Sequence, residues 1–240
     1  MVKSLFNPNL DGSASPDHPL SEKKVFTFNR QGIFSILGIL CIIFIPHTGI
    51  FPFFSYSILL TFMIWWMLKL NGEKFSYIGF SFKRFSFHAM VTGVLCAIVF
   101  FVFMQYIFFP LLHKIIYLPP PNLDDFKFIR NNAGNYIFIL LMGWIIGGFY
   151  EELAFHGFIF TSLEKILGGK QAMILGFFIT NTLFALYHLQ LGTQGVINAF
   201  VAGCAYHALM LNSKRNMWYA FFFHGFFDTI ALTYIYLGYW

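Results

Sequence analysis

Residues 135–162 read NYIFILLMGWIIGGFYEELAFHGFIFTS, an apolar run with two adjacent carboxylates near its centre. The run is longer than the roughly 20 residues that an α-helix needs to cross the hydrocarbon core of a bilayer. A carboxylate at the centre of a spanning helix costs about 2.5 to 3.5 kcal/mol even on lenient insertion scales. Glu151 and Glu152 therefore need polar partners elsewhere in the chain.

The composition of the whole chain indicates a membrane protein. Of its 240 residues, 58% are hydrophobic and 10% are charged, whereas about 25% of the residues in a soluble domain are charged. The mean hydropathy is +0.68, and such a chain has too few polar residues to cover itself in water. The basic residues behind the net charge of +5 stand in short runs between apolar stretches, so nucleic acid is excluded as a partner.

The hydropathy pattern predicts an all-α, polytopic transmembrane bundle of about seven spans. Residues 1–28 are polar, and we expect them to form a disordered cytoplasmic tail. Residues 29–134 are expected to hold N-terminal transmembrane helices, with an interfacial linker near 70–87. Residues 135–240 are expected to form the helical core that carries the chemistry. The expected spans are 31–46, 51–69, 87–112, 135–162, 171–190, 194–212 and 216–238.

The distribution of basic residues predicts the orientation in the membrane. Twelve of the fifteen Lys and Arg residues lie in the N-terminal segment and in the loops after the second, fourth and sixth spans. The other three, Lys114, Lys127 and Arg130, lie on the opposite side. Because cytoplasmic loops retain an excess of Lys and Arg, we expect a cytoplasmic N-terminus and a C-terminus outside.

One of the two adjacent carboxylates has a histidine partner within the same run. Glu152 and His156 are separated by four residues, so on an α-helix they share a face and can pair. Glu151 is rotated from Glu152 by about 100° and has to point elsewhere. The run therefore predicts one carboxylate that is paired locally and one that is directed at another part of the protein.

Two later spans carry polar side chains at helical spacing. Asn181 and His188 lie on one stripe of the fifth span, and His224 and Asp228 are four residues apart on the seventh. Burial against one another removes such groups from lipid, so we expect the three helices to converge on a shared polar cavity. His207, on the sixth span, is isolated in sequence and is interpreted as a structural histidine.

The expected span boundaries contain one conflict. They place Glu151 near the middle of the membrane and His188 near the outer end of its own span. The two side chains can meet only if the helices are tilted or broken, or if the boundaries are shifted by a turn or two.

The three polar segments resemble the motifs of the CPBP family, the CAAX protease and bacteriocin-processing (Abi) proteins. The family pattern has Glu-Glu-x-x-x-Arg, Phe-x-x-x-His and His-x-x-x-Asn on successive helices. The similar stretches here are EELAFH at 151–156, FALYH at 184–188 and HGFFD at 224–228, within a resemblance from about residue 135 to the end. His156 stands where the family has arginine, and Asp228 stands where it usually has asparagine.

The resemblance implies an intramembrane endopeptidase of metallo- or glutamic type, which hydrolyses a peptide bond with an activated water. Glu151 is then expected to be the general base, with His188 holding and polarising the same water. His224, together with Asp228, is expected to stabilise the oxyanion. The substrate is expected to be a peptide or a membrane protein within the lipid bilayer, in a bacterial plasma membrane. Glu152, His156 and Asn181 are expected to hold the catalytic side chains and their helices in position without touching the substrate.

Three alternatives remain open. The preferred mechanism requires no cofactor, but Glu151, His188, His224 and Asp228 are also a set of donors that zinc or another divalent metal could use. In a non-catalytic family member, such as a bacteriocin immunity protein or a membrane scaffold, the buried pairs would only hold helices together. An ion or proton transporter would also bury carboxylates and histidines. Against a transporter, the sequence has no interrupted helices in two matching halves.

Overall fold

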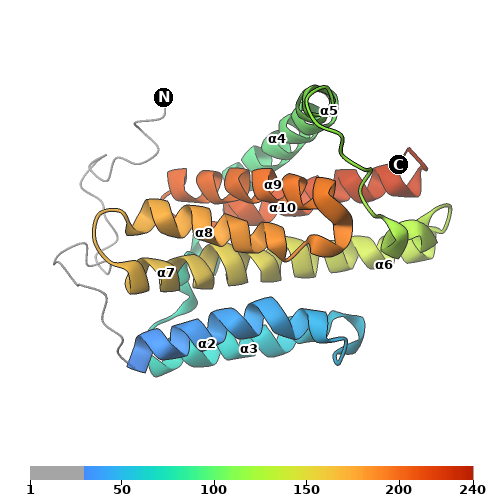
Figure 1. Cartoon of the computed structure of the whole chain (residues 1–240). Helices are drawn as coiled ribbons and strands as arrows, with labels where there is room; N and C mark the ends of the chain where they lie inside the picture. The colour runs from blue at the N-terminus through green and yellow to red at the C-terminus, as the bar shows by residue number, and fades with distance from the viewer. Residues whose placement is uncertain (1–29, 240) are drawn as a thin grey trace.

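A computed structural model of the chain describes residues 30–239 as a bundle of helices (Figure 1). No β-strand is present within this part of the chain. The predicted all-α class is therefore confirmed. The polar tail predicted for residues 1–28 lies outside the described residues.

Within residues 30–239 several of the longer helices are built from consecutive pieces. The pieces, in chain order, are α2 (Arg30–Phe44), η1 (Ile45–Thr48), η2 (Pro52–Phe54), α3 (Tyr56–Leu70), η3 (Phe75–Ile78), η4 (Phe82–Arg84), α4 (Phe87–Phe103), η5 (Met104–Phe108), α5 (Phe109–His113), η6 (Asp124–Ile129), α6 (Ala133–Met142), η7 (Gly143–Ile159), α7 (Phe160–Leu167), α8 (Ala172–Leu186), η8 (Leu189–Leu191), α9 (Gly192–Asn212) and α10 (Met217–Tyr236). Each of the seven predicted spans overlaps a helix, although the bounds differ: Ala133–Leu167 and α9 extend beyond the ranges predicted for them. Among the described residues, Phe87–His113, Ala133–Leu167 and Leu189–Asn212 are long and apolar enough to cross a membrane.

Side-chain caps determine where three of the main helices begin. The Ser86 hydroxyl accepts a hydrogen bond from the backbone N–H three residues further on, at 3.1 Å, and so starts α4. The Asn132 carboxamide starts α6 in the same way at 3.0 Å. The Asn216 carboxamide accepts from the N–H two residues on, at 3.3 Å, and starts α10. Each cap satisfies a backbone donor that the first helical turn leaves without a partner.

The sequence suggested a regular α-helix over the span 135–162. The long helix Ala133–Leu167 is instead irregular in its middle. Its middle, η7, is wound as a π-helix over Gly143–Ile159. Such wide turns are rare and are found mostly at functional sites. The shorter π-helical piece η5 comes just before Pro110, whose ring would clash with the carbonyl four residues earlier in a regular helix. Both Glu151 and Glu152 lie within η7.

Helix α10 lies within the bundle and packs against α4, η7 and α9, while α2 and α3 form a pair beside η7 (Figure 1). Small residues allow the backbones to approach closely. A Cβ added at Gly93 of α4 would lie 2.5 Å from Phe222 Cβ, and one added at Gly148 of η7 would lie 3.4 Å from Gly225 Cα. These glycines fix how near α4 and η7 come to α10, and hence where the polar residues of α10 lie.

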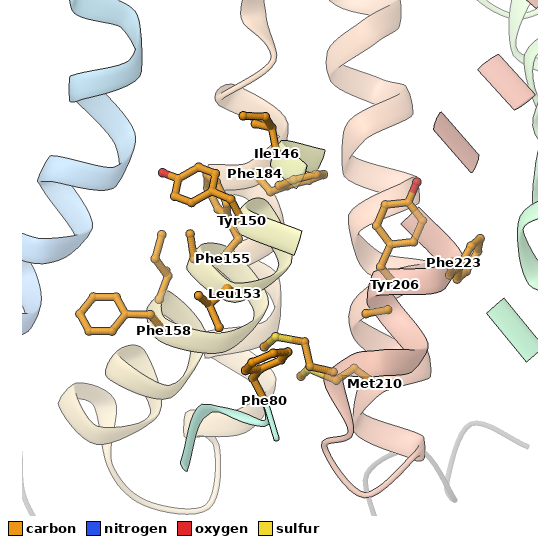
Figure 2. Packing of buried hydrophobic residues seen from close by; sticks show 14 of the residues in the cluster. Phe80, Ile146, Tyr150, Leu153, Phe155, Phe158, Phe184, Tyr206, Met210 and Phe223 are labelled. Carbon is orange, nitrogen blue, oxygen red and sulfur yellow. The ribbon is translucent and has the colours of Figure 1, made fainter. Parts of the chain in front are cut away.

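The linker near residues 70–87 contributes to the core. Ile78 and Phe80 are buried, and the Phe80 ring lies 5.2 Å from that of Phe149 and 5.5 Å from that of Trp218. Figure 2 shows Phe80 in the same cluster of buried side chains as residues of η7 and α9. Phe82, by contrast, is 76% exposed. The linker is therefore fastened to the bundle by two apolar side chains, while one of its rings faces outward.

Candidate active site

Four of the site residues predicted from the sequence line one cavity of about 950 Å³. Glu151 comes from η7, His188 follows the end of α8, and His224 and Asp228 come from α10. Glu151 Oε2 lies 3.8 Å from His188 Nε2, and His224 Nε2 lies 3.5 Å from Asp228 Oδ2. The structure thus brings side chains from three separate helical segments to the wall of one cavity.

The conflict in depth between Glu151 and His188 is resolved by unequal helix lengths. Helix α8 ends at Leu186, so the span predicted for 171–190 was too long by about a turn. The helix Ala133–Leu167 has 35 residues, many more than the roughly 20 that a helix needs to cross a hydrocarbon core of about 30 Å. The end of the short helix therefore lies opposite the middle of the long one.

The orientation of the His188 ring follows from its backbone partner. Its Nδ1 lies 2.8 Å from the carbonyl oxygen of Phe184. Because a carbonyl oxygen only accepts hydrogen bonds, Nδ1 has to carry the proton. In the neutral ring Nε2 then has a free lone pair, and this nitrogen faces Glu151 and the cavity. His188 can therefore accept a hydrogen bond from a molecule in the cavity.

Glu152 is fully buried and bridges two helical segments. Its Oε2 lies 2.7 Å from His156 Nδ1, which is the pair predicted from their spacing. Its Oε1 lies 2.9 Å from His224 Nδ1, a contact with α10 that the sequence did not indicate. Glu152, rather than Asp228, is thus the carboxylate that holds the His224 ring through Nδ1. The other ring nitrogen, Nε2, faces Asp228.

The buried network continues from His156 to helix α9. His156 Nε2 lies 3.1 Å from Asn181 Oδ1, and Asn181 Nδ2 donates to Phe177 O at 2.8 Å and to His207 Nδ1 at 3.1 Å. His207, interpreted from the sequence as a structural histidine, is a fully buried member of this network. The sequence signal for its place was weak, since a single histidine on an apolar span indicates no particular partner.

Tyr206 is a further site residue that the sequence analysis did not single out. Its ring stacks on that of His224, with centroids 4.6 Å apart and an angle of 19° between the planes. Tyr206 also lines the cavity. Together with Glu152, which binds one edge of the His224 ring, it restricts how that ring can rotate.

A glycine provides the space for His224 and Asp228. A Cβ added at Gly147 would overlap Asp228 Oδ2 and would lie 3.2 Å from His224 Nε2. We expect Gly147→Ala to push both side chains away from the cavity wall and to lower activity by at least tenfold. Gly143→Ala is the matched control, because its added Cβ would meet Leu232 and Asp228 no closer than 3.4 Å. Equal activities of the two variants, measured at equal protein amounts, would contradict this account of Gly147.

The described side chains do not form a metal site in this arrangement. No group of three or more His, Cys, Asp or Glu residues within 30–239 is placed as a set of ligands. His188 Nδ1 and His224 Nδ1 are both directed at protein oxygens, which leaves each ring one nitrogen toward the cavity.

Fold and site together define an integral membrane protein of apolar helices with a polar centre at the wall of an internal cavity. Residues 133–230 match the family model described as "Type II CAAX prenyl endopeptidase Rce1-like". This segment, which contains all three motifs noted in the sequence, is thus similar to a family of CAAX proteases. No curated protein and no solved structure matches the chain.

Proposed function

We propose that the chain is an intramembrane endopeptidase that hydrolyses a peptide bond with a water bound by Glu151 and His188. The observation that carries this proposal is the distance of 3.8 Å between Glu151 Oε2 and His188 Nε2 at the cavity wall. That distance is too long for a direct hydrogen bond. A water on the cavity side can lie about 2.8 Å from both atoms, which is an ordinary hydrogen-bond distance.

The geometry suggests how the reaction would proceed. Glu151 takes a proton from the water as its oxygen attacks the peptide carbonyl, while His188 Nε2 accepts the second hydrogen bond of that water. Both ring nitrogens of His224 face carboxylate oxygens, so an Nε2–H group can be directed at the developing oxyanion. Glu151 then gives its proton to the leaving nitrogen as the C–N bond breaks. The products are a carboxylate and an amine, and no covalent enzyme intermediate forms.

The cavity supports an apolar peptide or a segment of a membrane protein as the substrate. Away from the polar centre its walls are formed largely by apolar side chains, among them Phe101, Met104, Phe109, Ile139 and Leu232. Burial of apolar substrate side chains against these walls is favourable. A peptide can therefore bind mainly through the apolar walls and present one amide to Glu151 and His188.

The proposal is tested by cleavage of peptides in vesicles by the purified chain, with and without a metal chelator. The probe is a mixture of synthetic peptides with apolar segments, and mass spectrometry detects new termini. We expect cleavage that proceeds at an unchanged rate after chelation. Loss of cleavage on chelation, with recovery on adding zinc, would replace the proposed mechanism by a metal-dependent one. Absence of cleavage under all conditions would favour a non-catalytic family member.

A further inference from the structure

The cavity has a second polar feature, on α9 and the turn before it. Among the residues that line the cavity there, Gln194, Asn198, Ala202 and Tyr206 lie four apart on α9, and Gln190 lies in η8 just before that helix; Leu191, Gly195 and Ala199 line the cavity beside them. Residues four apart share one face of an α-helix. Gln190, Gln194 and Asn198 carry carboxamides, and Tyr206 stacks on His224. A polar stripe therefore runs along the cavity wall and ends at the centre described above.

One carboxamide of this stripe has an oxygen without a hydrogen-bond partner. Gln194 Oε1 is buried and has no hydrogen-bond partner within residues 30–239. A buried polar atom without a partner costs free energy and is rare in folded proteins. Gln190 is exposed and lines the cavity, as do Pro120 and Pro121. The Gln194 oxygen is thus a hydrogen-bond acceptor without a protein partner, on a residue of the cavity wall.

The spacing of the stripe matches the repeat of an extended peptide. Four helical residues rise by about 6 Å, and an extended chain repeats every two residues, or about 6.6 Å. A carboxamide has one acceptor oxygen and an NH₂ donor, which is the complement of a backbone N–H and C=O. One carboxamide can therefore pair with every second residue of an extended peptide, whatever its side chains are.

We propose that Gln190, Gln194 and Asn198 form a carboxamide ladder that binds the backbone of an extended peptide and leads it to the catalytic centre. The proposal rests on the proposed function and narrows its substrate class to unfolded, extended segments. Within α9 the stripe extends over the 12 residues from Gln194 to Tyr206. At 1.5 Å per residue it is about 18 Å long, which matches roughly five extended residues. Because the ladder binds only backbone groups, it does not distinguish one peptide sequence from another. Any preference for particular side chains then comes from the apolar walls of the cavity.

Peptide binding to the full chain tests the ladder without requiring cleavage. The background is Glu151→Gln in vesicles or detergent, and the probe is a fluorescent ten-residue apolar peptide whose affinity is measured by anisotropy. We expect Gln194→Met and Asn198→Leu, which keep side-chain size and lose the hydrogen bonds, each to weaken binding by about three- to tenfold. Gln171→Met is the matched control, since Gln171 is exposed at the start of α8 and is not among the cavity-lining residues.

Backbone methylation of the peptide gives a second, independent measurement. N-methylation at the residues that meet the ladder should weaken binding to the parent chain and weaken it much less in Gln194→Met, because the same hydrogen bond is already lost. Equal affinities of Gln194→Met, Asn198→Leu and Gln171→Met would overturn the ladder and leave the proposed hydrolysis standing. Suppose that Gln194→Met and Asn198→Leu weaken peptide binding but the chain that retains Glu151 cleaves no peptide. The proposed hydrolysis would then be refuted, and the proposed ladder would be supported.

Discussion

Glu151→Gln is expected to abolish peptide cleavage while leaving the amount of protein in the membrane unchanged. The carboxamide has the same size as the carboxylate but cannot take a proton from the attacking water. General-base catalysis contributes about 10²- to 10⁴-fold, so the rate should fall by at least two orders of magnitude. Because Glu151 lines the cavity and contacts His188 only at 3.8 Å, its replacement should leave the fold intact. The measurement is the rate of peptide hydrolysis at equal amounts of purified protein.

Two further variants define the specificity of this effect. His188→Ala is expected to cause a comparable loss, because the water then has one partner instead of two. Glu164→Gln is the matched control, because Glu164 lies on α7 and is not among the cavity-lining residues. Its carboxylate accepts two hydrogen bonds from Arg215, each of 2.7 Å. A Glu151→Gln protein that keeps more than a tenth of the parent rate would refute the assignment of Glu151 as the general base.

Glu152→Ala is expected to lower the stability of the folded protein as well as its activity. The substitution leaves His156 Nδ1 and His224 Nδ1 without their carboxylate partner in a fully buried place. Removing one partner of a buried ion pair typically costs about 3 to 5 kcal/mol. The free energy of unfolding in detergent, or the midpoint of thermal unfolding, measures the loss.

The matched control for Glu152 is an acidic residue in a more accessible pair. Glu73 binds Lys165 at 2.5 Å, and the lysine side chain is 39% exposed. Exposed ion pairs contribute about 0 to 1 kcal/mol, so Glu73→Ala should change stability by no more than that. Equal destabilisation by Glu73→Ala and Glu152→Ala would show that the bridge between η7 and α10 has no special place in the fold.

The helices could be predicted from the sequence because lipid imposes a simple pattern of long apolar runs. Each of the seven predicted segments overlaps a helix. The pairing of Glu152 with His156 was also predictable, because residues four apart share a helix face. The π-helical winding of η7 was not, since it depends on how the helix packs against its neighbours and not on residue spacing alone.

Contacts between helices were the other part that the sequence could not supply. Glu152 reaches His224 across 72 residues, and Asn181 reaches His207 across 26. Such distances in the chain are bridged only by the relative rotation of packed helices, which spacing within one helix does not determine. For the same reason the face of α9 that carries Gln194 could not be assigned to the cavity from its sequence.

The position of Asn181 limits what the buried histidines can conduct. A proton wire needs groups that accept a proton on one side and release another on the opposite side, as imidazole does. Asn181 offers a fixed acceptor to His156 and fixed donors to Phe177 O and His207, and an amide does not exchange these roles. Charge arriving at His156 therefore stops there. The row of buried histidines therefore separates the proposed hydrolytic centre from α9, which argues against ion or proton transport along this line.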